Sequence, residues 1–322
     1  MNKKGFTITE LLVTLFIIGI VLSAAYITYI RLLKGFKSEK EKIASQIENL
    51  VGLEILRLDL EHIGYGIPKE ETKKLIEWDG SKLILRSTLN NTNKSTLGYL
   101  VGKCTSSQIN ITYDGREDKT NNYVTILQDD KSFFDKGTIS SNIINSSKSC
   151  TSGNIYIAFP VRKKVYNGSS NDCQKGLCER ITYSLTDSNL PDRCNVNTKK
   201  LIRRVGRGNT GGETVLSCIA DWKITFDIDK NSDGKIDSSE ENLDDYSLLS
   251  DNTTIRKKLK LINVYMLVQE GRYDPNFEYS NNIKNCGSDK CVSIDNIELK
   301  LPTDYNHYRW KVLKISVKPM DL

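Results

Sequence analysis

Residues 229–240 read DKNSDGKIDSSE and carry oxygen-bearing side chains at alternate positions. Carboxylate, amide and backbone carbonyl oxygens are the ligands that Ca²⁺ prefers in proteins. Four carboxylates this close along the chain repel one another unless a cation lies among them, and Gly234 permits the sharp turn that directs them inward. We therefore predict a bound, structural calcium ion. The expected ligands are Asp229, Asn231, Asp233, the carbonyl group of Lys235, Asp237 and Glu240.

The spacing of these ligands is that of an EF-hand calcium loop, in which positions 1, 3, 5, 7, 9 and 12 bind the ion and position 6 is glycine. The flanks differ from an EF-hand, because residues 222–228 alternate in polarity as a strand does. The alternative is a solvated Asp/Asn/Gly hairpin without an ion. If calcium binds, we expect a weak affinity of about 10⁻⁴ to 10⁻³ M and a role in rigidifying the surrounding domain.

A further acid, Glu10, lies at the entrance of an apolar segment. Residues 11–30 carry no charge, and twenty such residues in a helix span a bilayer. Lys3 and Lys4 precede the segment, so the positive-inside rule places the start of the chain in the cytoplasm and the rest across the membrane. A carboxylate beside hydrocarbon costs about 2.5 to 3.5 kcal/mol without a partner. Glu10 therefore requires a cationic group nearby.

The order Gly5, Phe6 and Glu10 closely resembles the N-terminus of type IV pilins. In that family a prepilin peptidase cleaves after the glycine and methylates the new N-terminal residue. The resemblance implies cleavage after Gly5 and methylation of Phe6 in this chain. It also implies that Glu10, at the fifth mature position, pairs with the α-amino group of Phe6 on its own or a neighbouring subunit. Glu10 is then an assembly residue, because this pairing offsets the desolvation cost and favours the correct axial register.

A cleaved secretory signal is the alternative interpretation, because Ser23-Ala24-Ala25 follows a suitable apolar core at residues 11–22. Against it, Glu10 lies at the mouth of that core, and apolar residues continue at helical spacing past the cleavage site. We predict one helix over residues 6–62, about 85 Å long, half in lipid or fibre core and half buried by a globular head. The residues that predict this second half are Ile43, Ile47, Leu50, Val51, Ile55 and Leu58.

Beyond Pro68 the sequence predicts short strands separated by polar turns, and hence an antiparallel sheet packed on the helix. The predicted class is α+β, with the pilin fold that the resemblance implies. We expect a leader at 1–5, a transmembrane helix at 6–30, an amphipathic stalk helix at 31–67 and a β-rich head at 68–322. The expected strands are 83–86, 123–127, 155–159, 181–185, 201–205, 222–228, 261–268 and 310–317.

Several stretches resemble the PilW family of minor pilins over nearly the full chain. They are LDL at 58–60 with GYG at 64–66, residues 219–229, and the closing HYRWKV at 307–312. Residues 87–122 and 129–153 do not match and are interpreted as insertions. The resemblance implies a subunit near the pilus tip or in the assembly-priming complex. Its head would be periplasmic and its helix in the inner membrane, with other major and minor pilins, prepilin peptidase and the inner-membrane assembly platform as partners.

Eight cysteines, none of them in the first hundred residues, indicate an oxidising compartment and disulfides. Two pairs are separated by four residues each, so each pair could close its own loop, and the other four would then pair in sequence order. A zinc site is the rival interpretation, but the chain has only two histidines. The favoured pairs are Cys104 with Cys150, Cys173 with Cys178, Cys194 with Cys218, and Cys286 with Cys291.

The net charge of +6, about +4 once Lys3 and Lys4 leave with the leader, is too small to indicate nucleic-acid binding. The basic clusters at 199–207 and 256–260 are interpreted as solvated faces, because apolar residues alternate with the charges. The sequence has no nucleophile elbow, zincin motif or phosphate-binding glycine loop, so we predict a protein that is not an enzyme.

Three alternatives to a minor pilin stay open. A type II secretion pseudopilin would share the leader, the helix and the sheet, although the large head and its insertions favour a pilus. A pilus-tip adhesin could use the Asn/Ser-rich insertions and the calcium loop as a binding surface. A membrane-tethered hydrolase is the most distant of the three.

Overall fold

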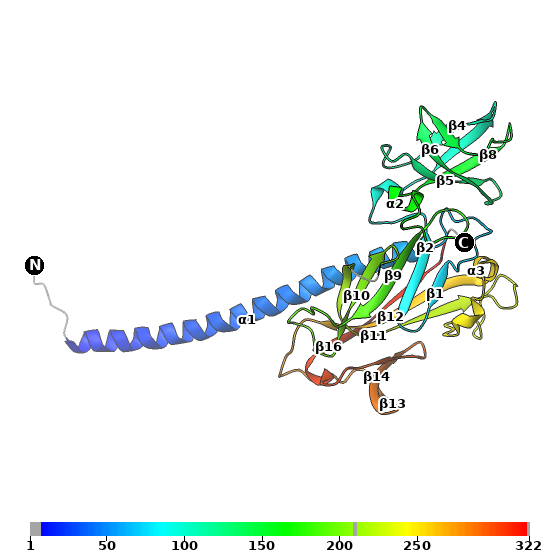
Figure 1. The fold of residues 1–322 in the computed structure, drawn as a ribbon. Helices are drawn as coiled ribbons and strands as arrows, with labels where there is room; N and C mark the ends of the chain where they lie inside the picture. The colour runs from blue at the N-terminus through cyan, green and yellow to red at the C-terminus, as the bar shows by residue number, and fades with distance from the viewer. Residues whose placement is uncertain (1–7, 209–210, 321–322) are drawn as a thin grey trace, which may run out of the picture.

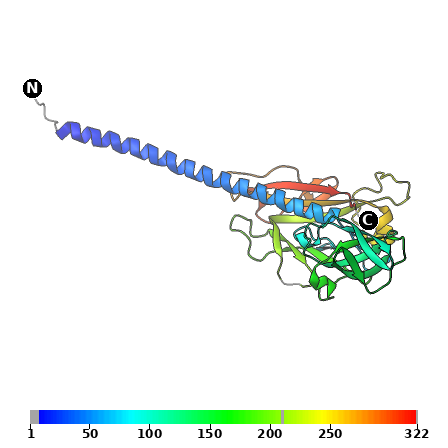
Figure 2. The same cartoon turned by 90° about the horizontal axis from the view of Figure 1, so that it is seen from above.

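The computed structural model describes residues 8–208 and 211–320. One long helix projects from a β-rich head (Figure 1), and a view from above shows the head gathered at the C-terminal end of that helix (Figure 2). The predicted α+β class, with a long N-terminal helix on an antiparallel head and disulfide-closed loops, is confirmed.

The long helix α1 extends over Ile8–Glu61, and its end lies one residue before the predicted 62 and six before the stalk-helix boundary expected at 67. No proline interrupts these 54 residues, and Gly64 and Gly66 follow with positive φ angles of 83° and 66° that stop the helix. The other helices in the described part of the chain are short. They are α2 (Lys163–Tyr166) and α3 (Asn252–Lys258), with 3₁₀ turns η1 (Lys94–Thr96), η2 (Tyr246–Leu248) and η3 (Tyr305–His307).

A seven-stranded antiparallel sheet forms the part of the head that packs on α1. All eight predicted strand segments are strands, and six of them belong to this sheet. In spatial order its strands are β1 (Ile76–Trp78), β2 (Lys82–Ser87), β9 (Glu179–Thr186), β10 (Lys199–Val205), β11 (Glu213–Ile228), β12 (Leu259–Glu270) and β16 (Arg309–Val317).

The other two predicted segments lie in a separate closed barrel, which corrects the expectation of a single sheet. The barrel is inserted in the chain between β2 and β9, and the two stretches interpreted as insertions supply most of it. Its strands, in order around the barrel, are β3 (Leu100–Thr105), β4 (Gln108–Asp114), β7 (Ile143–Ser146), β6 (Phe133–Ser140), β5 (Tyr123–Gln128) and β8 (Ile155–Pro160). A three-stranded sheet of β13 (Ile283–Cys286), β14 (Asp289–Ile294) and β15 (Ile297–Lys300) completes the head.

The main hydrophobic core joins the end of α1 to the seven-stranded sheet. Leu56, Leu60 and Ile63 from the helix and its end are fully buried against sheet residues such as Leu216 and Phe226. The barrel has its own smaller core around Leu100, Ile126 and Tyr156. Because the two cores are distinct, the barrel is a second packing unit added to the sheet.

Four disulfides close loops of the head, in the same four pairs that the sequence order favoured. Cys104–Cys150 lies within the barrel, Cys173–Cys178 in the loop before β9, and Cys194–Cys218 attaches a loop to β11. Cys286–Cys291 joins β13 to β14. Because every cysteine is paired, none is available as the thiolate that a zinc site needs.

Candidate functional site

The N-terminal part of α1 presents an apolar surface that the head does not cover. The segment Ile8–Leu33 is long and apolar enough to cross a membrane, and none of it is buried by the rest of the chain. Glu10 lies in the first turn of the helix and is exposed. Gly5 and Phe6 lie outside the described residues.

Three hydroxyl groups within this segment are satisfied by the helix itself. The Oγ atoms of Thr14, Ser23 and Thr28 donate to backbone carbonyls three or four residues earlier, over 2.8–3.0 Å. In an apolar surrounding an unpaired hydroxyl costs free energy, so this local pairing suits a helix embedded in lipid or among other apolar helices.

The exposed apolar surface continues well past Leu33, which corrects the predicted burial of the second half of the helix. Ile43, Ile47, Leu50 and Val51 are each more than half exposed, with Leu50 at 70%. Their helical spacing is as predicted, but the head contacts this part of the helix through an ion pair between Arg193 and Glu48 and buries a described helix residue first at Gly52. The other two predicted stalk residues, Ile55 and Leu58, are half-buried. This stripe is therefore available to another molecule.

Gly52 marks the point where helix and sheet come into contact. A Cβ atom at this position would lie 2.1 Å from the carbonyl oxygen of Val215 and 2.6 Å from a methyl group of Leu216, both in β11. Only glycine permits the helix backbone to approach the strand this closely.

A buried ion pair fixes the last turns of α1 to the sheet. Asp59 accepts hydrogen bonds from Arg203 at both carboxylate oxygens, 2.6 Å from Nε and 3.1 Å from Nη2. The hydroxyl of Tyr183 donates to the same carboxylate over 2.6 Å. Burial, and then the adjacent carboxylate, raise the pKa of Tyr183 well above its usual value, so the phenol stays a donor. Arg203 lies in the basic cluster predicted as a solvated face, and that prediction is wrong for this residue.

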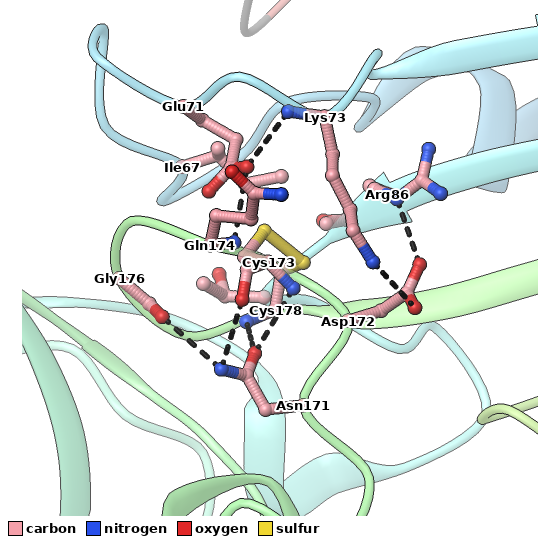
Figure 3. The surroundings of a disulfide bond; sticks show 12 residues. Ile67, Glu71, Lys73, Arg86, Asn171, Asp172, Cys173, Gln174, Gly176 and Cys178 are labelled. Atoms are coloured by element: carbon pink, nitrogen blue, oxygen red, sulfur yellow. Dashed lines mark hydrogen bonds and ion pairs between the residues drawn. A yellow bond between two sulfur atoms is a disulfide. The ribbon is translucent and has the colours of Figure 1, made fainter.

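The loop closed by Cys173–Cys178 holds the chain that leaves α1 (Figure 3). The side chain of Asn171 accepts from the amides of Cys173 and Cys178 and donates to the carbonyl groups of Cys173 and Gly176. Glu71, from the segment after the helix, accepts from the backbone amides of this loop at residues 174 and 175. The disulfide loop therefore attaches the helix–sheet connection to the chain between the barrel and β9.

Asp172, in the same loop, is nearly buried and lies among three cations. Its carboxylate is 2.8 Å from Nε of Arg86, 3.4 Å from Nζ of Lys73 and 3.2 Å from Nε of Arg207. Burial alone would raise the pKa of Asp172, but the charge of Arg86 and the other cations outweighs burial and lowers it. The carboxylate is thus held in its charged form, as Figure 3 shows for Arg86 and Lys73.

The residues predicted to bind calcium form one compact loop directly after β11. Asp229 and Glu240, the first and last of them, are both 2% exposed. Asp229 accepts from the amides of Asp233 and Gly234 over 3.1 and 2.9 Å. Glu240 accepts from the amides of residues 230 and 237 over 2.7 and 3.3 Å. Gly234 has a φ of 84°, which the turn requires.

The donor set of this loop fits a hard cation such as Ca²⁺, because its side chains supply only oxygen. Nζ of Lys260 lies 3.4 Å from Oδ2 of Asp229 and partly offsets the negative charge. Within the described residues, no three of the four loop carboxylates have oxygen atoms that all lie within 4.8 Å of one another. The carboxylate oxygens of the loop are therefore too far apart to bind one ion together. They must move closer to one another for an ion to bind.

The start of the sequence gives the decisive comparison. Residues 1–26 match the prokaryotic N-terminal methylation motif. The methylation motif includes Gly5, Phe6 and Glu10 and ends inside α1, so it coincides with the first part of the exposed apolar helix. No curated protein matches the sequence.

Among solved structures the chain is similar to a type IV-like pilin from Thermus thermophilus, with 8% identity and a TM-score of 0.32. The alignment covers 84% of this chain and 96% of that chain. At this TM-score the likeness does not place individual residues in correspondence.

Proposed function

We propose that this chain is a minor pilin of a type IV pilus, a structural subunit that catalyses no reaction. The observation that supports the proposal is a methylation motif at the start of a helix whose exposed apolar side chains extend from Ile8 to Val51. The segment Ile8–Leu33 of this helix needs an apolar surrounding. A membrane supplies it before assembly, and a bundle of like helices supplies it in the fibre.

Assembly in this proposal depends on Glu10. Cleavage after Gly5 would leave a new α-amino group on Phe6, four positions before Glu10 and so about one helical turn away. When a subunit moves from lipid into the fibre, the carboxylate of Glu10 pairs with the amine of Phe6 on its own or a neighbouring subunit. The pair offsets the desolvation cost of the carboxylate and selects one axial register.

The finer assignment is to a PilW-like minor pilin at or near the tip, or in the complex that primes assembly. The large head with its inserted barrel supports this, since a bulky unit is easier to place at a fibre end than along its shaft. The head would be periplasmic and the helix in the inner membrane until assembly. The partners would be other major and minor pilins, prepilin peptidase and the inner-membrane assembly platform.

We further propose that the loop 229–240 binds a structural Ca²⁺ ion. Asp229, Asn231, Asp233, Asp237, Glu240 and the carbonyl group of Lys235 would hold it. The inward-turned carboxylates of Asp229 and Glu240 support the proposal, because burial of two acids in one loop is costly without a cation. The ion would fix the segment between β11 and α3 and so rigidify the head.

The runner-up is a pseudopilin of a type II secretion system. A pair of variants tests the assembly mechanism, and the location and deletion of the wild-type chain separate the two functions. We expect Glu10→Gln to remain in the membrane but to be lost from sheared pili. Glu39→Gln, which changes an exposed acid of the same helix outside the apolar segment, should enter pili normally. Normal incorporation of Glu10→Gln would contradict the assembly mechanism. Absence of the wild-type chain from pili, together with a secretion defect on its deletion, would favour the pseudopilin.

A further inference from the structure

A cavity of about 420 Å³ lies between the β1–β2 hairpin and the segment 246–249 that follows the calcium loop. It is part of the head, remote in sequence from the helix surface on which assembly depends. A volume of this size is within the range of small-molecule sites in proteins. Its lining combines aromatic and aliphatic side chains with charged groups of both signs.

The walls of the cavity are aromatic and held rigidly. Trp78 is only 8% exposed, and its ring lies perpendicular to that of Trp222 with the centroids 5.0 Å apart. Phe226 and Leu249 form a buried part of the lining. Tyr246 is 44% exposed and therefore offers an accessible ring. Such surfaces suit a flat ligand with C–H groups on its faces.

The charges of the residues that line the cavity sum to zero. Lys74 and Lys82 carry positive charge, and Glu77 and Asp79 carry negative charge. Within the described part of the chain, neither ammonium group has a hydrogen-bond or ion-pair partner. One carboxylate oxygen of Glu77 pairs with Arg86. One carboxylate oxygen of Asp79 accepts hydrogen bonds from the backbone amides of residues 81 and 82 in the same turn. The second oxygen of each acid has no hydrogen-bond partner among the residues that the structure describes, so the cavity presents both donors and acceptors.

This arrangement discriminates among classes of ligand. For an anion, attraction by Lys74 and Lys82 is opposed by repulsion from Glu77 and Asp79, and for a cation the two effects are reversed. The lining therefore favours neither sign of net charge. A hydroxyl group both donates and accepts, so a ring with several hydroxyls can use ammonium and carboxylate groups at once. We propose that this cavity is a binding site for a neutral saccharide of about one or two rings, stacked on Tyr246. The proposal is independent of whether the chain assembles into a pilus.

Saturation-transfer NMR on the full chain in a zwitterionic, sugar-free detergent tests the site. The probes are glucose, galactose, N-acetylglucosamine and lactose, with acetate and ethylamine as charged controls. We expect saturable binding of at least one sugar and none of either control. Tyr246→Ala and Lys82→Ala change exposed residues and should each weaken binding about tenfold. Tyr273→Ala removes an equally exposed tyrosine elsewhere, 51% exposed, and should leave binding unchanged.

Three outcomes would overturn the proposal. One is that no sugar of the panel binds saturably. Another is that binding is the same in Tyr246→Ala and Lys82→Ala as in the wild-type chain. The third is that acetate or ethylamine occupies the cavity in place of the sugars.

Discussion

The carboxylate of Asp59 and the guanidinium of Arg203 form an ion pair with almost no exposed surface, 0% and 2% for the two side chains. One partner belongs to the last turns of α1 and the other to β10, in the middle of the seven-stranded sheet. A pair in this position fixes the direction in which the long helix leaves the head. In a fibre subunit that direction sets where the head lies relative to the helix bundle.

Replacing Asp59 by Asn should therefore destabilise the fold strongly. The change leaves the charge of Arg203 buried without its partner, which costs about 3 to 5 kcal/mol in comparable cases. Glu54→Gln is the matched control, because Glu54 pairs with Arg57 on the exposed face of the same helix, where solvent screens the interaction and such pairs contribute little. Denaturant unfolding of both variants measures the difference. Equal stability of the two would contradict the role of the buried pair.

Gly52→Ala should loosen the contact between helix and sheet. The added methyl group would meet the carbonyl oxygen of Val215 at 2.1 Å, so the helix must shift away from β11. Gly35→Ala is made in the same helix where nothing lies within 4 Å, and should be neutral or stabilising by up to about 1 kcal/mol. In thermal unfolding we expect Gly52→Ala to lower the melting temperature and Gly35→Ala to leave it unchanged or raise it. A neutral Gly52→Ala would show that the close approach is not required.

Asp172 should make the disulfide-closed junction sensitive to acid. Its pKa is lowered in the folded chain, against an ordinary value of about 3.9. The stabilisation is therefore complete above about pH 4 and is lost as the pH falls through the folded pKa. Asp172→Asn should lose stability at pH 7 and show a smaller further loss between pH 5 and pH 2. Parallel pH profiles of the two proteins would contradict this account.

Removal of calcium should lower the stability of the head. At about 10 mM Ca²⁺ and a dissociation constant of about 10⁻⁴ to 10⁻³ M, binding contributes about 1.4 to 2.7 kcal/mol. Asp237→Asn should abolish the response of the melting temperature to a chelator. Asp118→Asn is the matched control, because Asp118 makes the same local turn with Thr120 that Asp237 makes with Ser239, but lies outside the loop. An unchanged midpoint of the wild-type chain on chelation would remove the ion from this account.

Features encoded over short distances were predictable from the sequence. Helical spacing predicted the end of α1 at residue 62, one position past Glu61, and alternation predicted eight of the sixteen strands in the described residues. Two of the disulfides close loops of only a few residues. In each case the interacting residues are neighbours along the chain, so their spacing carries the information.

Features that depend on distant contacts were not predictable. Asp59 and Arg203 are 144 residues apart in the sequence. Apolar and charged residues alternate around Arg203, and this pattern is the same whether the charged side chains face solvent or cover a buried acid. The sequence predicts a single sheet, without a separate barrel, because β5 and β8 have the same local pattern as the strands of the main sheet. The stripe from Ile43 to Val51 has the spacing of a buried face, but the sequence does not say whether its own head or another molecule covers it.

Mass spectrometry of the N-terminal peptide of the mature chain, purified from its native membrane, tests the central claim most directly. The account predicts a chain that begins at Phe6 and carries one methyl group on its α-amino nitrogen. A mature chain that begins at Ala25, or one that retains residues 1–5, would contradict it.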